Sequence, residues 1–164
     1  MKYPIEVSKR KIIVTAVVKG VYDDTKLKFI LDTGATKSVF DEEAVRQLGY
    51  ELFRLQAGDR LMTAGGAIRS KVLTLPKFSL MGKNVSNFEV NVIKFPMQIS
   101  LLADGLLGMD FLLHFKNIKF DFDAKTIETG ETTPHTSYAV QVCKHCGCEN
   151  GEDYVFCKKC GGKL

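Results

Sequence analysis

Residues 29–36 read F-I-L-D-T-G-A-T, so an apolar strand leads directly into an aspartate, a small hydroxyl residue and a glycine. Burying a carboxylate without a partner is costly, because the charge loses its hydration. A chain that places Asp32 at this point must therefore supply a group that compensates for the charge. Asp32 is for this reason the first candidate functional residue.

The sequence around this motif predicts a mostly β fold. Apolar and polar residues alternate, and turn-forming residues separate the segments. We predict strands at residues 5–18, 27–31, 51–55, 60–64, 67–75, 77–80, 85–93 and 118–122. We expect one or two short helices, at residues 41–48, with Ser38 as the N-cap, and at residues 109–115.

Composition divides the chain into a body, a linker and a small terminal module. Of 164 residues, 45% are hydrophobic, which is enough for one core. We predict a domain at 1–127, a polar linker at 128–142 and a cysteine module at 143–164. The net charge is +4, and the basic residues are scattered over the body, so the charge does not indicate nucleic-acid binding. The chain shows neither a signal peptide nor an apolar membrane segment, so we expect a cytoplasmic protein.

Three motifs in the body resemble those of retropepsin-like aspartic proteases. The first is the F-I-L-D-T-G-A-T segment at 29–36. The second, L-M-T-A-G-G-A-I-R at 61–69, is similar to the flap hairpin of that family. The third, D-G-L-L-G-M-D-F-L at 104–112, is similar to the element that packs beside the catalytic loop. The resemblance covers about residues 5–127 and implies a closed acid-protease β-barrel.

The resemblance implies that the chain is an aspartic endopeptidase. Two carboxyls held close together share one proton, because like charges at that distance cannot both ionise. One of them then takes a proton from water while the other donates one to the peptide. The chain has a single D-T-G, so the family solution is a homodimer with one Asp32 from each subunit.

The same resemblance assigns supporting roles to the neighbouring residues. Thr33 corresponds to the hydroxyl that bonds across the dimer beneath the acids, and Gly34 lets backbone and substrate approach closely. The expected active-site support is Thr33, Gly34 and Ala35. The flap residues expected to bind a protein or peptide substrate are Thr63, Ala64, Gly65 and Gly66.

Two alternatives use the same residues differently. The body could be a retropepsin-like dimer that grips extended peptides without cutting them, and the terminal module would target it. It could instead only dimerise, with the terminal module binding nucleic acid. The intact D-T-G favours the enzyme over the first, and the lack of a basic, aromatic-rich stripe disfavours the second.

The terminal module carries all five cysteines of the chain. Two C-x-x-C pairs, each followed by glycine, resemble the two knuckles of a short zinc ribbon. Four thiolates give the closed geometry of a structural zinc site with no place for a catalytic water. The expected ligands are Cys143, Cys146, Cys157 and Cys160. We expect Cys148 and His145 to face solvent, and a partner protein or nucleic acid to bind the ribbon.

Overall fold

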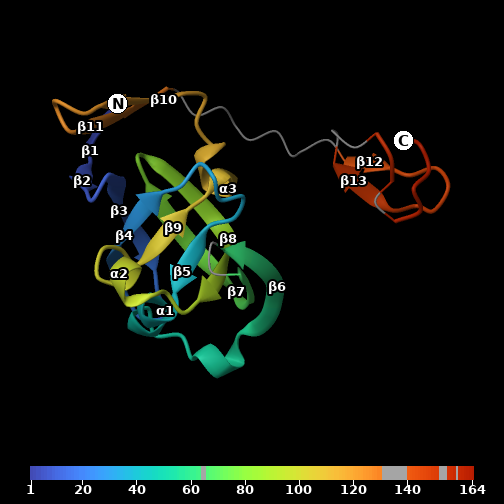
Figure 1. Ribbon diagram of the computed structural model, residues 1–164, viewed down its shortest axis with the longest axis horizontal. Coiled ribbons are helices and arrows are strands. Elements are labelled where there is room, and N and C mark those ends of the chain that lie inside the picture. Colours follow the sequence, from blue (N-terminus) through green and yellow to red (C-terminus); the bar gives the residue numbers. More distant parts are fainter. Residues whose placement is uncertain (64–65, 131–139, 152–154, 158) are drawn as a thin grey trace. The chain divides into compact units, whose positions relative to one another are not determined.

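The computed structural model describes residues 1–63, 66–130, 140–151, 155–157 and 159–164. The chain divides into two compact units, Met1–Thr132 and Thr133–Leu164. Figure 1 shows that both are built mainly from strands. The predicted linker begins within strand β11 (Thr126–Thr129) and ends with strand β12 (Val140–Val142), and its residues 131–139 lie outside the described part.

The first unit is a closed β-barrel, as the resemblance implied. Its main sheet has the order β2-β3-β4-β9-β5-β8-β7-β6, and β3 also pairs with β7. The strands β3, β4, β9, β5, β8 and β7 therefore form a closed ring. The bounds are β2 Glu6–Ser8, β3 Lys11–Lys19, β4 Asp24–Leu31, β5 Val39–Asp41, β6 Gln56–Thr63, β7 Gly66–Leu80, β8 Lys83–Ile93 and β9 Gly105–Leu107.

Short helices fill the gaps between these strands. The described residues form α1 (Glu42–Gln47), α2 (Met97–Ser100), α3 (Met109–Leu112) and a 3₁₀ turn, η1 (Leu52–Arg54). Helices α1 and α3 confirm the predicted positions. The predicted strand at 51–55 is wrong, since it contains η1. Helix α2 was not predicted, because four residues after a proline carry no readable helical period.

A cluster of phenylalanine rings holds the barrel together. Phe29 of β4 lies 4.8 Å from Phe40 of β5 and 5.4 Å from Phe78 of β7, measured between ring centroids. Phe78 lies 5.0 Å from Phe111 of α3, and all four rings are fully buried. The tilted and edge-on geometries are those that aromatic pairs favour. The cluster therefore anchors β4 and α3, the two elements on either side of the D-T-G loop.

One predicted strand is interrupted by a turn that the sequence did not announce. Residues 5–18 form β2 and β3, joined at Lys9 and Arg10, whose φ angles are 46° and 61°. Such a turn favours glycine or asparagine, so two basic residues gave no signal for it. A second tight turn, at Met81 and Gly82, joins β7 to β8 with φ angles of 49° and 74°.

A second, smaller sheet carries the start of the chain. Strands β1 (Lys2–Pro4) and β10 (Ile118–Asp121) both pair with β11. Ile127 of β11 is fully buried and joins the barrel core. The N-terminal strand is therefore held against residues 126–129 of the same chain (Figure 1).

The second unit contains a two-stranded sheet and two cysteine-bearing turns. Strand β12 pairs with β13 (Glu149–Gly151). Gly147 and Gly161 both have φ of 68°, in the left-handed region that glycine adopts without strain. Across the described residues of both units, no helix is long and apolar enough to cross a membrane.

Candidate functional site

Asp32 lies at the end of β4, where a tight turn begins. Its amide donates a hydrogen bond to the carbonyl of Leu107 in the parallel strand β9, at 3.0 Å. The Gly34 amide donates to Asp32 Oδ1 at 3.0 Å, and the Ala35 amide donates to the Asp32 carbonyl at 3.2 Å. The Asp32 side chain is half-buried, although its place after an apolar strand suggests deeper burial. The backbone of the turn therefore fixes the carboxyl while one face stays accessible.

The loop after Asp32 is tied to the start of α3. The Met109 amide donates to the carbonyl of Ala35 at 2.8 Å, and the Asp110 amide donates to that of Thr36 at 3.1 Å. Gly108 makes this approach possible, because an ideal Cβ there would stand only 2.8 Å from the Ala35 carbonyl oxygen. The L-L-G element therefore packs beside the D-T-G loop, as the resemblance implied.

Ser38 and Asp110 form a buried brace at the base of this loop. Ser38 is fully buried, and its hydroxyl donates to Asp110 Oδ1 at 2.7 Å while accepting from the Gly108 amide at 3.0 Å. The Ser38 amide donates to Asp110 Oδ2 at 2.9 Å. The predicted N-cap role of Ser38 is wrong, since Asp41 occupies the N-cap of α1. The sequence contains one indication of this brace, which is the acidic residue Asp110 in the first turn of the otherwise apolar helix α3.

A cavity of about 510 Å³ opens beside the Asp32 carboxyl. This volume is within the usual range for a ligand site. The lining comes from the D-T-G loop and from strands β5, β6, β8 and β9, of which β5 and β9 are paired neighbours. Its lining residues are Asp32, Gly34, Ala35, Thr36, Lys37, Val39, Arg60, Leu61, Ile93 and Leu106.

The hairpin β6–β7 contributes part of this lining and contains the predicted flap. Thr63 and Gly66 form its last backbone pair. Gly66 has φ of +109°, a conformation that side-chain-bearing residues rarely adopt. The other two predicted flap residues, Ala64 and Gly65, lie outside the described residues.

The chain carries one D-T-G motif, so a single chain contributes one aspartate of this kind, Asp32. Thr33 and Gly34 are exposed, and within the described residues the Thr33 hydroxyl forms no hydrogen bond. The loop can therefore present a carboxyl, a free hydroxyl and an accessible backbone to another molecule.

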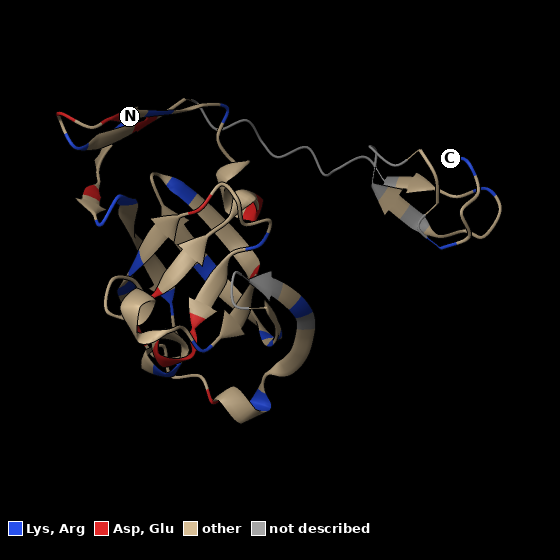
Figure 2. Ribbon diagram, in the orientation of Figure 1, with Lys and Arg blue, Asp and Glu red and all other residues tan. Residues whose placement is uncertain are grey.

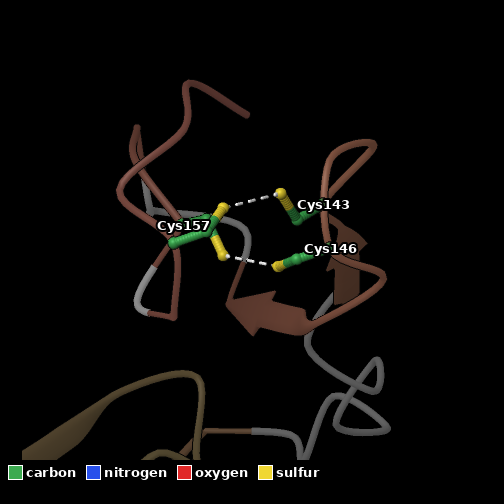
Figure 3. A group of neighbouring side chains, drawn as sticks. Cys143, Cys146 and Cys157 are labelled. Carbon is green, nitrogen blue, oxygen red and sulfur yellow. Dashed lines mark hydrogen bonds between the residues drawn. The ribbon is translucent and has the colours of Figure 1, made fainter.

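The second unit brings the four predicted cysteine ligands together. The Sγ atoms of Cys143, Cys146, Cys157 and Cys160 all lie within 4.8 Å of one another. Two pairs, Cys143–Cys160 and Cys146–Cys157, are 3.6 Å apart, and Figure 3 shows Cys143 and Cys146 facing Cys157. With Zn–S bonds of about 2.3 Å, sulfurs at the corners of a tetrahedron lie about 3.8 Å apart. The donor set and its spacing therefore fit a tetrahedral zinc ion.

The surroundings shift the pKa values of two of these thiols in opposite directions. The Cys160 and Lys159 amides both point at Cys157 Sγ, and they lower the pKa of that thiol to about 6. At Cys146 the Cys148 amide lowers the pKa, but burial and the neighbouring thiols outweigh it and raise the pKa to about 12. Four thiolates cannot coexist this closely without a positive charge between them. A bound divalent metal would supply that charge.

Cys148 and His145 are not part of the four-sulfur group among the described residues. The Cys148 carbonyl accepts hydrogen bonds from the Cys143 amide at 2.9 Å and from Asn150 Nδ2 at 2.7 Å. His145 is exposed. The backbone of Cys148 therefore shapes the first cysteine turn.

Comparison with known proteins identifies relatives of the first unit. A family model described as aspartyl protease matches residues 14–111. An uncharacterized protein of Rickettsia prowazekii (strain Madrid E) is 28% identical over 106 residues, which are 65% of this chain. The chain spans 43% of the length of that relative.

Two solved structures share the fold. A retropepsin-like aspartic protease from Rickettsia conorii is 26% identical and superposes with a TM-score of 0.59, over 77% of this chain and 88% of that one. The EIAV protease in complex with the inhibitor HBY-793 is 22% identical, with a TM-score of 0.51, over 64% of this chain and 88% of that one.

Proposed function

This chain belongs to the aspartyl protease family, and from that premise we propose that it is an aspartic endopeptidase. Two Asp32 carboxyls, one from each subunit of a homodimer, would activate the water molecule that attacks the peptide bond. The observation that carries the proposal is the position of Asp32. It lies inside the matched segment, at the end of β4, and it lines the cavity of the barrel.

The proposed chemistry needs one proton shared between the two carboxyls. The ionised carboxyl takes a proton from water, and the water oxygen attacks the carbonyl carbon of the peptide. The protonated carboxyl donates its proton to the carbonyl oxygen. The carboxyl that took a proton from water then passes it to the leaving nitrogen as the C–N bond breaks. The other carboxyl regains a proton from a hydroxyl of the tetrahedral species, which becomes the new carboxylic acid. The Gly34 amide holds Asp32 Oδ1, which leaves Oδ2 free for this exchange.

A second copy of the chain would complete the site. The Thr33 hydroxyl is exposed and without a partner in the described residues, and in such a dimer it would bond across the twofold axis beneath the acids. Gly34 and Ala35 would support the same loop. Thr63, Ala64, Gly65 and Gly66 would close over an extended peptide and donate backbone hydrogen bonds to it.

The second unit is proposed as a zinc ribbon with one structural ion. Zinc would supply the folding energy that so small a module cannot obtain from a core. The ribbon would act as an adaptor for another protein or a nucleic acid. All five cysteines are free thiols, which suits the reducing cytoplasm.

The test is cleavage of a diverse peptide library, with products identified by mass spectrometry. We expect the wild type to cut and Asp32→Asn to be inactive, because the variant keeps the shape of the side chain and removes the shared charge. Asp24→Asn is the matched control, since Asp24 is exposed and, among the described residues, forms an ion pair only with Lys19, at 3.5 Å. Equal turnover by Asp32→Asn would refute the assignment.

The dimer is tested by dilution. As the protein is diluted, the specific activity and the sedimentation coefficient should fall over the same concentration range, because a single protomer brings only one carboxyl. A monomer with full activity would contradict the shared site.

A further inference from the structure

Two arginines face each other across the flap hairpin. Arg60 of β6 is the direct cross-strand partner of Arg69 of β7. Side chains in this position have Cβ atoms about 4.5–5.5 Å apart, and like charges there repel each other. Both residues are exposed, and in the described part of the chain neither forms an ion pair. Figure 2 shows basic residues in blue, among them a band on β6.

A β-bulge sets this alignment. Between the pairs Ala57↔Lys71 and Arg60↔Arg69, strand β6 has one residue more than β7. Gly58 lies in the bulge, where an ideal Cβ would stand 2.5 Å from the nearest side-chain atom of β7. The extra residue places Arg60 on the same face of the hairpin as Arg69 and Lys71. Bulges commonly redirect a side chain in this way beside functional sites.

Arg60 also borders the cavity that contains Asp32. The cavity has a second cationic residue, Lys37, whose amine already lies 3.4 Å from a Glu89 carboxylate oxygen. Val39 and Ile93 make much of the remaining wall apolar. Among the described lining residues, Arg60 is therefore the cation that is not engaged in an ion pair.

We propose that Arg60, with Arg69 beside it, binds the carboxylate of an aspartate or glutamate side chain in the peptide substrate. The inference rests on the proposed protease function and adds a substrate class to it. A guanidinium presents a planar pair of donors that matches a carboxylate in geometry and charge. An acidic side chain would also relieve the repulsion between the two arginines. The apolar wall of the cavity would then hold a neighbouring apolar side chain.

The experiment compares peptides that differ by one charge. A cleaved peptide is resynthesised with Glu, Gln or Lys at each position near the scissile bond. Its ends are acetylated and amidated, so that the side chain is the only carboxylate tested. The ratio of kcat/KM for Glu over Gln is measured for wild type, Arg60→Gln, Arg60→Lys, Arg60→Glu and Arg69→Gln. Arg10→Gln, in the exposed turn between β2 and β3, is the matched control.

At one position we expect the wild type to favour Glu about tenfold or more, as the loss of a charge-assisted hydrogen bond implies. The ratio should approach one in Arg60→Gln, fall in Arg69→Gln and stay partly intact in Arg60→Lys. Arg60→Glu should favour Lys instead, and Arg10→Gln should match the wild type. A wild type without acidic preference, or a preference that survives Arg60→Gln and Arg60→Glu, would overturn the proposal.

A binding measurement separates this proposal from the protease assignment. Fluorescence anisotropy of labelled Glu and Gln peptides is measured with Asp32→Asn, alone and combined with Arg60→Gln. Tighter binding of the Glu peptide that disappears with Arg60 supports acid recognition even if no peptide is ever cut. Cleavage by the wild type with equal binding of both peptides refutes acid recognition and leaves the protease intact.

Discussion

Ser38→Ala removes one oxygen atom and should destabilise the barrel strongly. The buried Gly108 amide loses its acceptor, which alone costs about 1–3 kcal/mol. Asp110 loses a hydroxyl donor at 2.7 Å but keeps the Ser38 and Phe111 amides. We therefore expect a total loss of about 2–4 kcal/mol in the free energy of unfolding, which for a chain of this size lowers Tm by about 5–15 °C.

The assay is urea unfolding of wild type and variant, followed by calorimetry. Ser79→Ala is the matched control, because the Ser79 hydroxyl makes a similar contact, 2.6 Å from Asn84 Oδ1, at a solvent-accessible position. It should change stability by less than about 0.5 kcal/mol. If both variants lose the same free energy of unfolding, the Ser38–Asp110 contacts contribute no more than an exposed hydrogen bond, and the reasoning is refuted.

Four further outcomes are expected. Gly108→Ala should cost about 1–3 kcal/mol in denaturant unfolding, because its Cβ would press on the backbone of the D-T-G loop. Cys143→Ser combined with Cys157→Ser should abolish zinc binding in metal analysis and leave the barrel folded, whereas Cys148→Ser should retain zinc. Zinc affinity should fall as the pH is lowered from 7 to 5, because zinc binds thiolates and protons compete for them. Titration against a competing chelator at the two pH values measures the change. Peptide cleavage should follow a bell-shaped pH profile on the acid side of neutrality, since the dyad works only with one shared proton.

The sequence predicted those parts of the molecule whose signal is local. The D-T-G motif and its apolar strand lie within eight residues, and each cysteine pair lies within four. The residue types in such short motifs determine the local backbone geometry, so this geometry can be predicted without knowledge of the fold. The alternation of β-strands is equally local, and it gave the mostly β class that the barrel confirms.

The sequence missed features that depend on distant parts of the chain. Ser38 and Asp110 are 72 residues apart, and nothing near Ser38 indicates that it will be buried. Its hydroxyl suited a helix cap equally well. The Arg60–Arg69 pair required the register of the hairpin, which a bulge at Gly58 shifts by one residue. Alternation alone would have put Arg60 on the opposite face of the hairpin.

The brace also bears on how the proposed dimer would assemble. Asp32 is held through its own amide, bonded to Leu107, and through Oδ1, bonded to Gly34. Ser38 and Asp110 fix the far end of the same loop. All of these contacts lie within one protomer, so the carboxyl is oriented when the chain folds rather than when two chains meet. In this loop, association would then have little backbone left to order, which lowers the entropic cost of bringing the two carboxyls together.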